Sequence, residues 1–267
     1  MAIVSDICRF LEDLAPLHLA EKWDNVGLLL GRDRETVKRL MTCLTLTLPV
    51  ADEAIAEHAQ MIVTHHPILF HGTKKITDQS IDGQLILRLA EAGIAVYCPH
   101  TAFDNAEDGI NHQLAEAIGL SQITPLRKTE PSSTNGAGRF GILANPCERG
   151  DFLNRVSAAV NSDYLEVSWE GPGTAHRVAI ACGAAGEYFA DAVKQGCDTF
   201  ITGETRFHTV LECQANGINL ILTGHFPSER PAIETLARKL GKQFPEVLCF
   251  PSSADRNPLS LYRRVSP

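Results

Sequence analysis

The segment Gln60-Met61-Ile62-Val63-Thr64-His65-His66-Pro67 is an apolar run that ends abruptly in two histidines and a proline. A short apolar run bounded by turn-forming residues is typical of a buried strand. Other apolar runs lead into His100-Thr101-Ala102-Phe103-Asp104 and Gly224-His225-Phe226-Pro227-Ser228-Glu229. Three strand-to-loop junctions therefore carry imidazoles or carboxylates, the side chains that bind divalent metal ions.

Strand-like and helix-like segments alternate on both sides of these junctions. The sequence predicts strands at 40–46, 60–64, 94–98, 177–182, 199–202 and 219–223. It predicts helices near 3–14, 50–58, 81–92, 109–118, 151–160, 188–194 and 209–216. This alternation predicts an α/β fold with mixed, mostly parallel sheets that are covered by helices.

A final helix is predicted after the third junction. Ser228 can cap this helix, Pro231 suits its first turn, and Gly241 would end it. Glu229 would then lie at the start of the helix, beside its positive end. His225 would lie on the incoming loop.

The stretch Lys128–Gly138 is rich in turn formers and marks the clearest break in the chain. We therefore expect two similar α/β lobes, residues 1–127 and 175–267. Between them we expect a linker and a short middle segment, residues 128–174. The second lobe would complete the metal site.

Composition excludes several classes of protein. A net charge of -8 argues against a sequence-independent nucleic-acid surface, which would normally be basic. No apolar stretch has the length of a membrane span, and charges interrupt the apolar residues at the N-terminus, unlike a signal peptide. The eight cysteines are scattered and form no C-x-x-C pair, so we expect a reducing, cytoplasmic location.

The three junctions together predict a metal centre. In an open α/β sheet, ligands bind beyond the carboxyl ends of the strands, where the loops converge. Taken singly, Asp104 is more simply a helix cap, and a lone histidine is more often a hydrogen-bonding residue. If the junctions converge, histidine with carboxylate suits zinc, iron or manganese, and a pair of such ions supports hydrolysis.

Three further motifs each have two interpretations. Gly183-Ala184-Ala185-Gly186 is either a phosphate cradle or, more simply, a tight turn. Glu204, Arg206 and His208 bring polar groups to another strand end, either for substrate binding and proton transfer or as ordinary residues at a helix start. Trp23-Asp24-Asn25-Val26-Gly27 is either a turn tucked under an indole ring or a polar border of the site.

These motifs, in this order and over nearly the whole chain, resemble the Nif-three-like dinuclear-metal-centre family. Asp255-Arg256-Asn257-Pro258-Leu259 also resembles the closing segment of that family. Bacterial members are often labelled GTP cyclohydrolase I type 2 homologs. The resemblance implies an α/β fold in its compact form, without a large inserted domain. It also implies a toroidal homohexamer whose metal sites face an internal cavity.

The resemblance also implies a ligand set. His65 and His225 would bind one metal, His66 and Asp104 the other, and Glu229 would bridge them. His208 occupies the place of a histidine near the metals and is a candidate proton carrier, while His100 would lie just outside the ligands. The chain departs from the family at Leu44-Thr45-Leu46-Thr47, where members often carry an acidic residue.

The expected function is a cytoplasmic, dinuclear metal-dependent hydrolase that acts on a small molecule. The activity named for the family is GTP cyclohydrolase, in which water attacks the purine imidazole ring and formate is released. His208 or Glu204 would move protons in that reaction. Two alternatives remain open: a two-metal phosphoesterase, and a non-enzymatic scaffold that stores or delivers metal ions.

Overall fold

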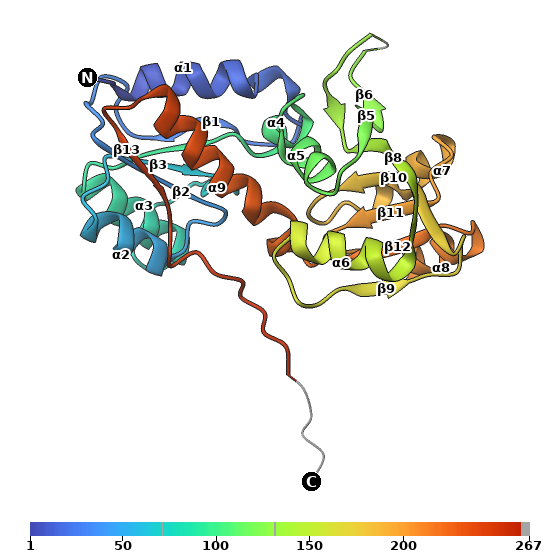
Figure 1. Cartoon of the computed structure of the whole chain (residues 1–267). Helices are drawn as coiled ribbons and strands as arrows, with labels where there is room; N and C mark the ends of the chain where they lie inside the picture. The colour runs from blue at the N-terminus through green and yellow to red at the C-terminus, as the bar shows by residue number, and fades with distance from the viewer. Residues whose placement is uncertain (71, 131, 263–267) are drawn as a thin grey trace.

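A computed structural model describes residues 1–70, 72–130 and 132–262. Pro131, within the predicted break, and the last five residues of the predicted second lobe lie outside this part. The described residues form two α/β lobes that lie side by side, with helix α9 (His225–Gln243) running from one to the other (Figure 1). The predicted α/β class, with two sheets covered by helices, is confirmed.

The first sheet holds the predicted strand that leads into His65. Its strands are, in order, β1 (Gly27–Leu30), β4 (Ala95–Cys98), β3 (Met61–Thr64), β2 (Arg39–Cys43) and β13 (Leu248–Pro251). Within this sheet, β4, β3, β2 and β13 run parallel, while the edge strand β1 is antiparallel. Every residue of β3 and β4 is buried, as expected for parallel strands with helices on both faces.

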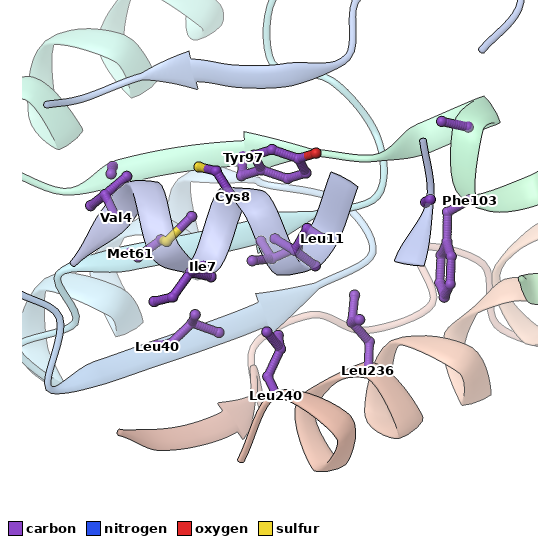
Figure 2. Close-up of a cluster of buried hydrophobic side chains, with 14 of the residues drawn as sticks. Val4, Ile7, Cys8, Leu11, Leu40, Met61, Tyr97, Phe103, Leu236 and Leu240 are labelled. Atoms are coloured by element: carbon purple, nitrogen blue, oxygen red, sulfur yellow. The ribbon is translucent and has the colours of Figure 1, made fainter. Parts of the chain in front are cut away.

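Helices α1 (Val4–Leu14) and α9 cover one face of this sheet. Val4, Ile7 and Leu11 recur at helical spacing on α1 and form its buried stripe. Figure 2 shows this stripe with Leu236 and Leu240 of α9 in one apolar cluster. Helices α2 (Leu48–Ala56) and α3 (Ile81–Glu91) supply the cluster on the opposite face.

The second sheet is mixed. Its strands are, in order, β5 (Ser121–Thr124), β8 (Arg139–Glu148), β10 (Thr174–Ala181), β11 (Thr199–Thr202), β12 (Asn219–Leu222) and β9 (Glu166–Ser168). The central strands β10, β11 and β12 are parallel, and the outer pairings are antiparallel. The expectation of mostly parallel strands therefore fits the first sheet better than the second.

Helices pack on both faces of the second sheet. Helices α5 (Ile110–Ala117) and α6 (Arg149–Ala159) supply one apolar cluster. Helices α7 (Phe189–Lys194) and α8 (Phe207–Ala215) supply the other. The remaining elements are α4 (His100–Asn105), the short pair β6 (Arg127–Lys128) and β7 (Gly136–Ala137), and the 3-10 turns Leu17–Leu19 and Gly186–Tyr188.

The sheets cross the domain boundaries expected from the sequence. Strand β5 precedes residue 128 but pairs in the second sheet, and the C-terminal strand β13 pairs in the first. The middle segment supplies β8, β9 and α6 to the second sheet. The division at 128 and 174 remains a prediction about domains. The places of β5 and β13 were not predicted, because strand pairing between distant segments carries no local sequence signal. No helix of the described residues is long and apolar enough to span a bilayer.

The predicted start of the last helix is wrong. The helix begins at His225, because Gly224 adopts a φ of 84° and turns the chain directly from β12 into the helix. Ser228 does not cap it: its hydroxyl donates to His225 O (2.7 Å) and accepts from Gly183 N (3.0 Å). Pro231 lies inside the helix, which continues past Gly241 to Gln243.

A buried arginine links the second sheet to α4. Arg139, at the start of β8, is only 1% exposed, and burial lowers its pKa to about 10. Its guanidinium donates to Gly136 O (2.5 Å) and Gly138 O (2.7 Å), and also to Asn105 O and Ala106 O at the C-terminal end of α4. A cation is favourable there, because the last carbonyls of a helix lack intrahelical donors.

We expect Arg139→Met to lower the free energy of unfolding by roughly 3 kcal/mol, because buried carbonyls lose their donor. Arg127→Met is the matched control. Arg127 is exposed on neighbouring β6 and pairs with Asp191, so its loss should cost less than about 1 kcal/mol. Urea unfolding followed by circular dichroism measures both, and equal effects would contradict the role of Arg139.

Candidate metal centre

His65 and His66 follow directly after the last residue of strand β3. His65 N donates to Cys43 O (3.0 Å) and His66 N to Leu44 O (2.9 Å), so both residues stay hydrogen-bonded to the end of β2 and the residue after it. The chain bends here instead of continuing as a strand, and the ring centroids of the two histidines are 5.1 Å apart. The side chain of His65 is fully buried, while that of His66 is 27% exposed.

His225 and Glu229 lie in the first turns of α9 and, being four residues apart, share one face of the helix. His225 Nε2 is 3.2 Å from Glu229 Oε2. His66 Nε2 approaches the same carboxylate oxygen, also at 3.2 Å. The helix thus brings a buried carboxylate from the second lobe against a histidine of the first.

Asp104 reaches the cluster from α4. Its Oδ1 lies 3.6 Å from His65 Nε2. The same helix begins with His100, whose ring centroid is 5.1 Å from that of His65 and 5.7 Å from that of His66. The five predicted metal-ligand residues, His65, His66, Asp104, His225 and Glu229, therefore come together.

The structure groups these residues differently from the expected pairs. The ligand atoms of His66, His225 and Glu229 lie within 4.8 Å of one another. His65 lies against Asp104 instead of His225, and it forms a second group with His66 and His100. The difference arises because His225 is helical, so its ring follows the face of Glu229 and meets His66.

Several atoms of the cluster fit a bound cation. Both ring nitrogens of His65 and Asp104 Oδ1 are buried and have no hydrogen-bond partner within the described residues. Buried polar atoms are normally hydrogen-bonded, so such a group calls for a ligand. Imidazoles with carboxylates suit zinc, iron or manganese.

Two neighbours orient the histidines that flank Glu229. Thr45 Oγ1 is 2.8 Å from His66 Nδ1, and Glu204 Oε1 is 2.9 Å from His225 Nδ1. Because Nδ1 of each histidine makes this contact, Nε2 is the ring nitrogen that faces Glu229. Such partners fix the tautomer and orientation of metal-binding histidines. Thr45, within the Leu44–Thr47 stretch, thus contacts a predicted metal ligand.

Asp24 holds His100 in place through a hydrogen bond. Its buried carboxylate accepts from His100 Nδ1 (2.8 Å), from Thr101 N (3.1 Å) and from the Thr101 hydroxyl. Burial opposes ionisation of Asp24, but these hydrogen bonds outweigh it and lower the pKa to about 2. The same contact raises the pKa of His100 against the effect of its own burial. The Trp23–Gly27 motif therefore borders the site.

The charges of the cluster compensate one another. Burial opposes ionisation of Glu229, yet hydrogen bonds with His225 and His66 lower its pKa well below the usual range. The hydrogen bond to Glu229 raises the pKa of His225 to about 9. Burial raises the pKa of Asp104, reinforced by the charge of Glu229, and burial keeps His65 neutral by lowering its pKa.

Gly183 follows β10 and packs against the carboxylate of Glu229. Its φ is +70°, and a Cβ there would lie 2.4 Å from Glu229 Oε1 and 3.5 Å from His225 Nε2. Its carbonyl accepts from Glu204 N (3.0 Å). Of the two interpretations of Gly183–Gly186, the structure supports a tight turn, which leaves room for Glu229.

Glu204 and His208, the two candidate proton carriers, differ in their contact with the cluster. Glu204 joins the cluster through His225. His208 is an exposed residue of α8 whose ring lies 5.8 Å from that of Phe207. In the part of the chain that the structure describes, His208 has no hydrogen bond to the cluster. Thr45 was not predicted as a site residue, and Gly183 was singled out only as part of a possible phosphate cradle.

Comparisons with known proteins agree with this geometry. Residues 2–258 match the family described as Duf34/NIF3 (NGG1p interacting factor 3). The chain belongs to this family. The resemblance proposed from the sequence motifs is therefore confirmed.

Members of the DUF34/NIF3 family are similar to the chain over most of its length. A Clostridium acetobutylicum protein named GTP cyclohydrolase 1 type 2 homolog is 34% identical over 238 residues, 89% of each chain. A Schizosaccharomyces pombe protein named NIF3 homolog is 32% identical, covering 97% of this chain and 98% of its own. The crystal structure of Staphylococcus aureus SA1388 has the same fold, with a TM-score of 0.87 at 24% identity over 98% of this chain and 99% of its own.

We expect Gly183→Ala to reduce the metal content of the purified protein by displacing Glu229. Gly196→Ala is the matched control, since Gly196 has a similar φ of +67° but nothing within 4 Å of its added Cβ. Both variants carry the same backbone strain, on the order of 1–2 kcal/mol. Elemental analysis after dialysis against metal compares them, and equal metal content would contradict the packing argument.

Metal binding should strengthen as pH rises towards 9. Below its raised pKa of about 9, His225 holds a proton that a metal must displace. Each displaced proton changes the apparent Kd by about tenfold per pH unit. Calorimetry in buffers of different ionisation enthalpy counts the protons released. A Kd independent of pH between about 6 and 8 would contradict this assignment of charge.

Proposed function

We propose that this protein is a divalent-metal-dependent hydrolase with a two-ion centre. The observation that supports the proposal most directly is the shared oxygen of Glu229, which lies 3.2 Å from both His66 Nε2 and His225 Nε2. His66 and His225 would hold one ion and His65 with Asp104 the other, with Glu229 between them. The unpartnered buried atoms of this cluster support that assignment.

A pair of bound divalent ions lowers the pKa of a water molecule and polarises a phosphoryl or carbonyl oxygen. Thr45 and Glu204 keep the two Nε2 atoms directed inward. His100, held by Asp24, places a ring with a raised pKa beside His65 and His66, so it can hold a proton at the centre. Roles for Glu204 and His208 in proton transfer remain predictions.

A cleft of about 1270 Å³ opens onto His66 and His225. Both lobes line it, for example through Thr45 and Tyr164, as do Arg230 and the C-terminal segment near Leu259. Arg230 already pairs with Asp255 (3.4 Å), so anionic groups of a substrate would depend mainly on the bound ions. The cleft is large enough for a small-molecule substrate.

GTP is the first substrate to test, because relatives carry the name GTP cyclohydrolase 1 type 2 homolog. The reaction would be water attack on the imidazole ring of the purine with release of formate. The same cluster would also support phosphoester hydrolysis, and a protein that binds metal without turnover would be a scaffold.

The assembly and location of the protein are part of the same proposal. We propose a toroidal homohexamer in the cytoplasm, without a nucleic-acid partner. The net charge of -8 supports the last point. The eight free cysteines support a reducing compartment.

Replacing Glu229 with Gln should remove metal and activity together. We expect metal affinity and turnover to fall at least about 100-fold. Removing a residue that only orients a metal ligand already weakens metal binding, and removing the ligand itself should weaken it more. Glu116→Gln is the control: Glu116 forms an exposed i,i+4 pair with His112 on α5, at 3.5 Å, and should be neutral.

The readouts are metal content, formate release from GTP and hydrolysis of p-nitrophenyl phosphate. Formate release that requires Glu229 supports the cyclohydrolase. Phosphoester turnover alone favours the phosphoesterase. Undiminished metal binding in Glu229→Gln would contradict the proposed centre.

A further inference from the structure

Two aromatic side chains beside the candidate metal centre are exposed. Trp23 is 59% exposed and Phe70 is 45% exposed. Their ring centroids are 5.7 Å apart, and the planes are tilted by 56°. Large rings that are clustered and open to solvent commonly mark a binding site.

This pair lies one ring away from the proposed ligands. The His100 ring centroid is 6.0 Å from that of Trp23 and 6.5 Å from that of Phe70. On its other sides, His100 packs against His65 and His66 at 5.1 and 5.7 Å. His100 therefore contacts both the aromatic pair and the histidines of the centre, which places the pair at the border of the centre.

The chain holds the pair in a fixed arrangement. Trp23 directly precedes Asp24, which is anchored to His100 and Thr101. Asn25 Nδ2 donates to Leu69 O (2.8 Å), which joins the turn that carries Trp23 to the loop that carries Phe70. This hydrogen bond and the contact between the rings join the two loops before any ligand binds.

We propose that Trp23 and Phe70 form a stacking subsite for a planar aromatic ring of the substrate. Every flat ring has π-faces that can stack on such side chains, and each stacking contact contributes substantially to binding. Any reaction of the substituents on that ring rests on the proposed hydrolase function. Binding of the ring itself is independent of that function.

The size of the exposed pair fits a ring better than a protein partner. From their exposed fractions, the two side chains present on the order of 200 Å². A stable protein interface covers about 800 Å² on each partner. The pair is closer in area to one heteroaromatic ring.

The two tryptophans of the chain allow a direct test. In Trp169→Phe, Trp23 is the only remaining tryptophan and reports on the subsite. We expect guanosine, adenosine or nicotinamide to quench its fluorescence saturably in the metal-loaded protein, and ribose to have no effect. These probes lack phosphate, so phosphate–metal contacts cannot produce the signal. Trp23→Phe, which leaves only Trp169, should show no such response.

Loss of one ring should weaken binding by about tenfold. We expect this for Phe70→Ala in the Trp169→Phe background and, by calorimetry, for Trp23→Ala. Trp23→Phe retains a ring and should keep most of the affinity. Phe207→Ala, which removes a 71% exposed ring on α8, is the control and should bind normally. Metal content should be unchanged in all of them.

The outcomes separate this inference from the hydrolase proposal. Saturable quenching without turnover of any substrate supports the subsite while contradicting the hydrolase. Turnover that Trp23→Ala and Phe70→Ala leave unchanged, with no quenching by any of the three probes, overturns the subsite alone. A smaller assembly mass for Trp23→Ala also overturns it, since the pair would then be a subunit interface.

Discussion

The buried carboxylate of Glu229 is the constraint on which this site depends. A carboxylate removed from water is stable only with close positive charge or several donors. His66 and His225 meet that need from opposite lobes, each at 3.2 Å from the same oxygen. Without metal, the raised pKa of His225 lets a proton supply the charge. A bound metal ion would therefore compete with a proton for one position, which would couple metal binding to pH.

The rest of the fold keeps that carboxylate and its neighbours in place. Helix α9 starts at the carboxyl end of β12 and then buries its apolar face against the first sheet (Figures 1 and 2). Helix α4 is held at both ends, by Asp24 near its start and by Arg139 at its last carbonyls. The candidate metal cluster is thus supported by contacts between the two lobes.

Much of this arrangement followed from local patterns. The strand before His65 is buried on both sides, so its apolar run was continuous and easy to recognise. Helix α1 was predicted because Ile3, Ile7, Phe10 and Leu14 recur at helical spacing. The ten-residue strand β8 was missed, because its residues alternate between buried and exposed over only part of its length. The start of α9 was misplaced because Ser228 resembles a cap, while Gly224 takes the positive φ that begins the helix.

The sequence by itself determined the chemical identity of the site: which histidines and carboxylates follow strands, and hence the class of metal they suit. Residue type and local hydrophobic pattern are properties of short segments, so they could be recognised without a structure. Only the tertiary structure decided which ligands face each other, that Thr45 and Gly183 shape the centre, and that Trp23 lies beside Phe70. Those contacts join residues distant in the chain, and their geometry depends on how the two sheets and α9 pack together.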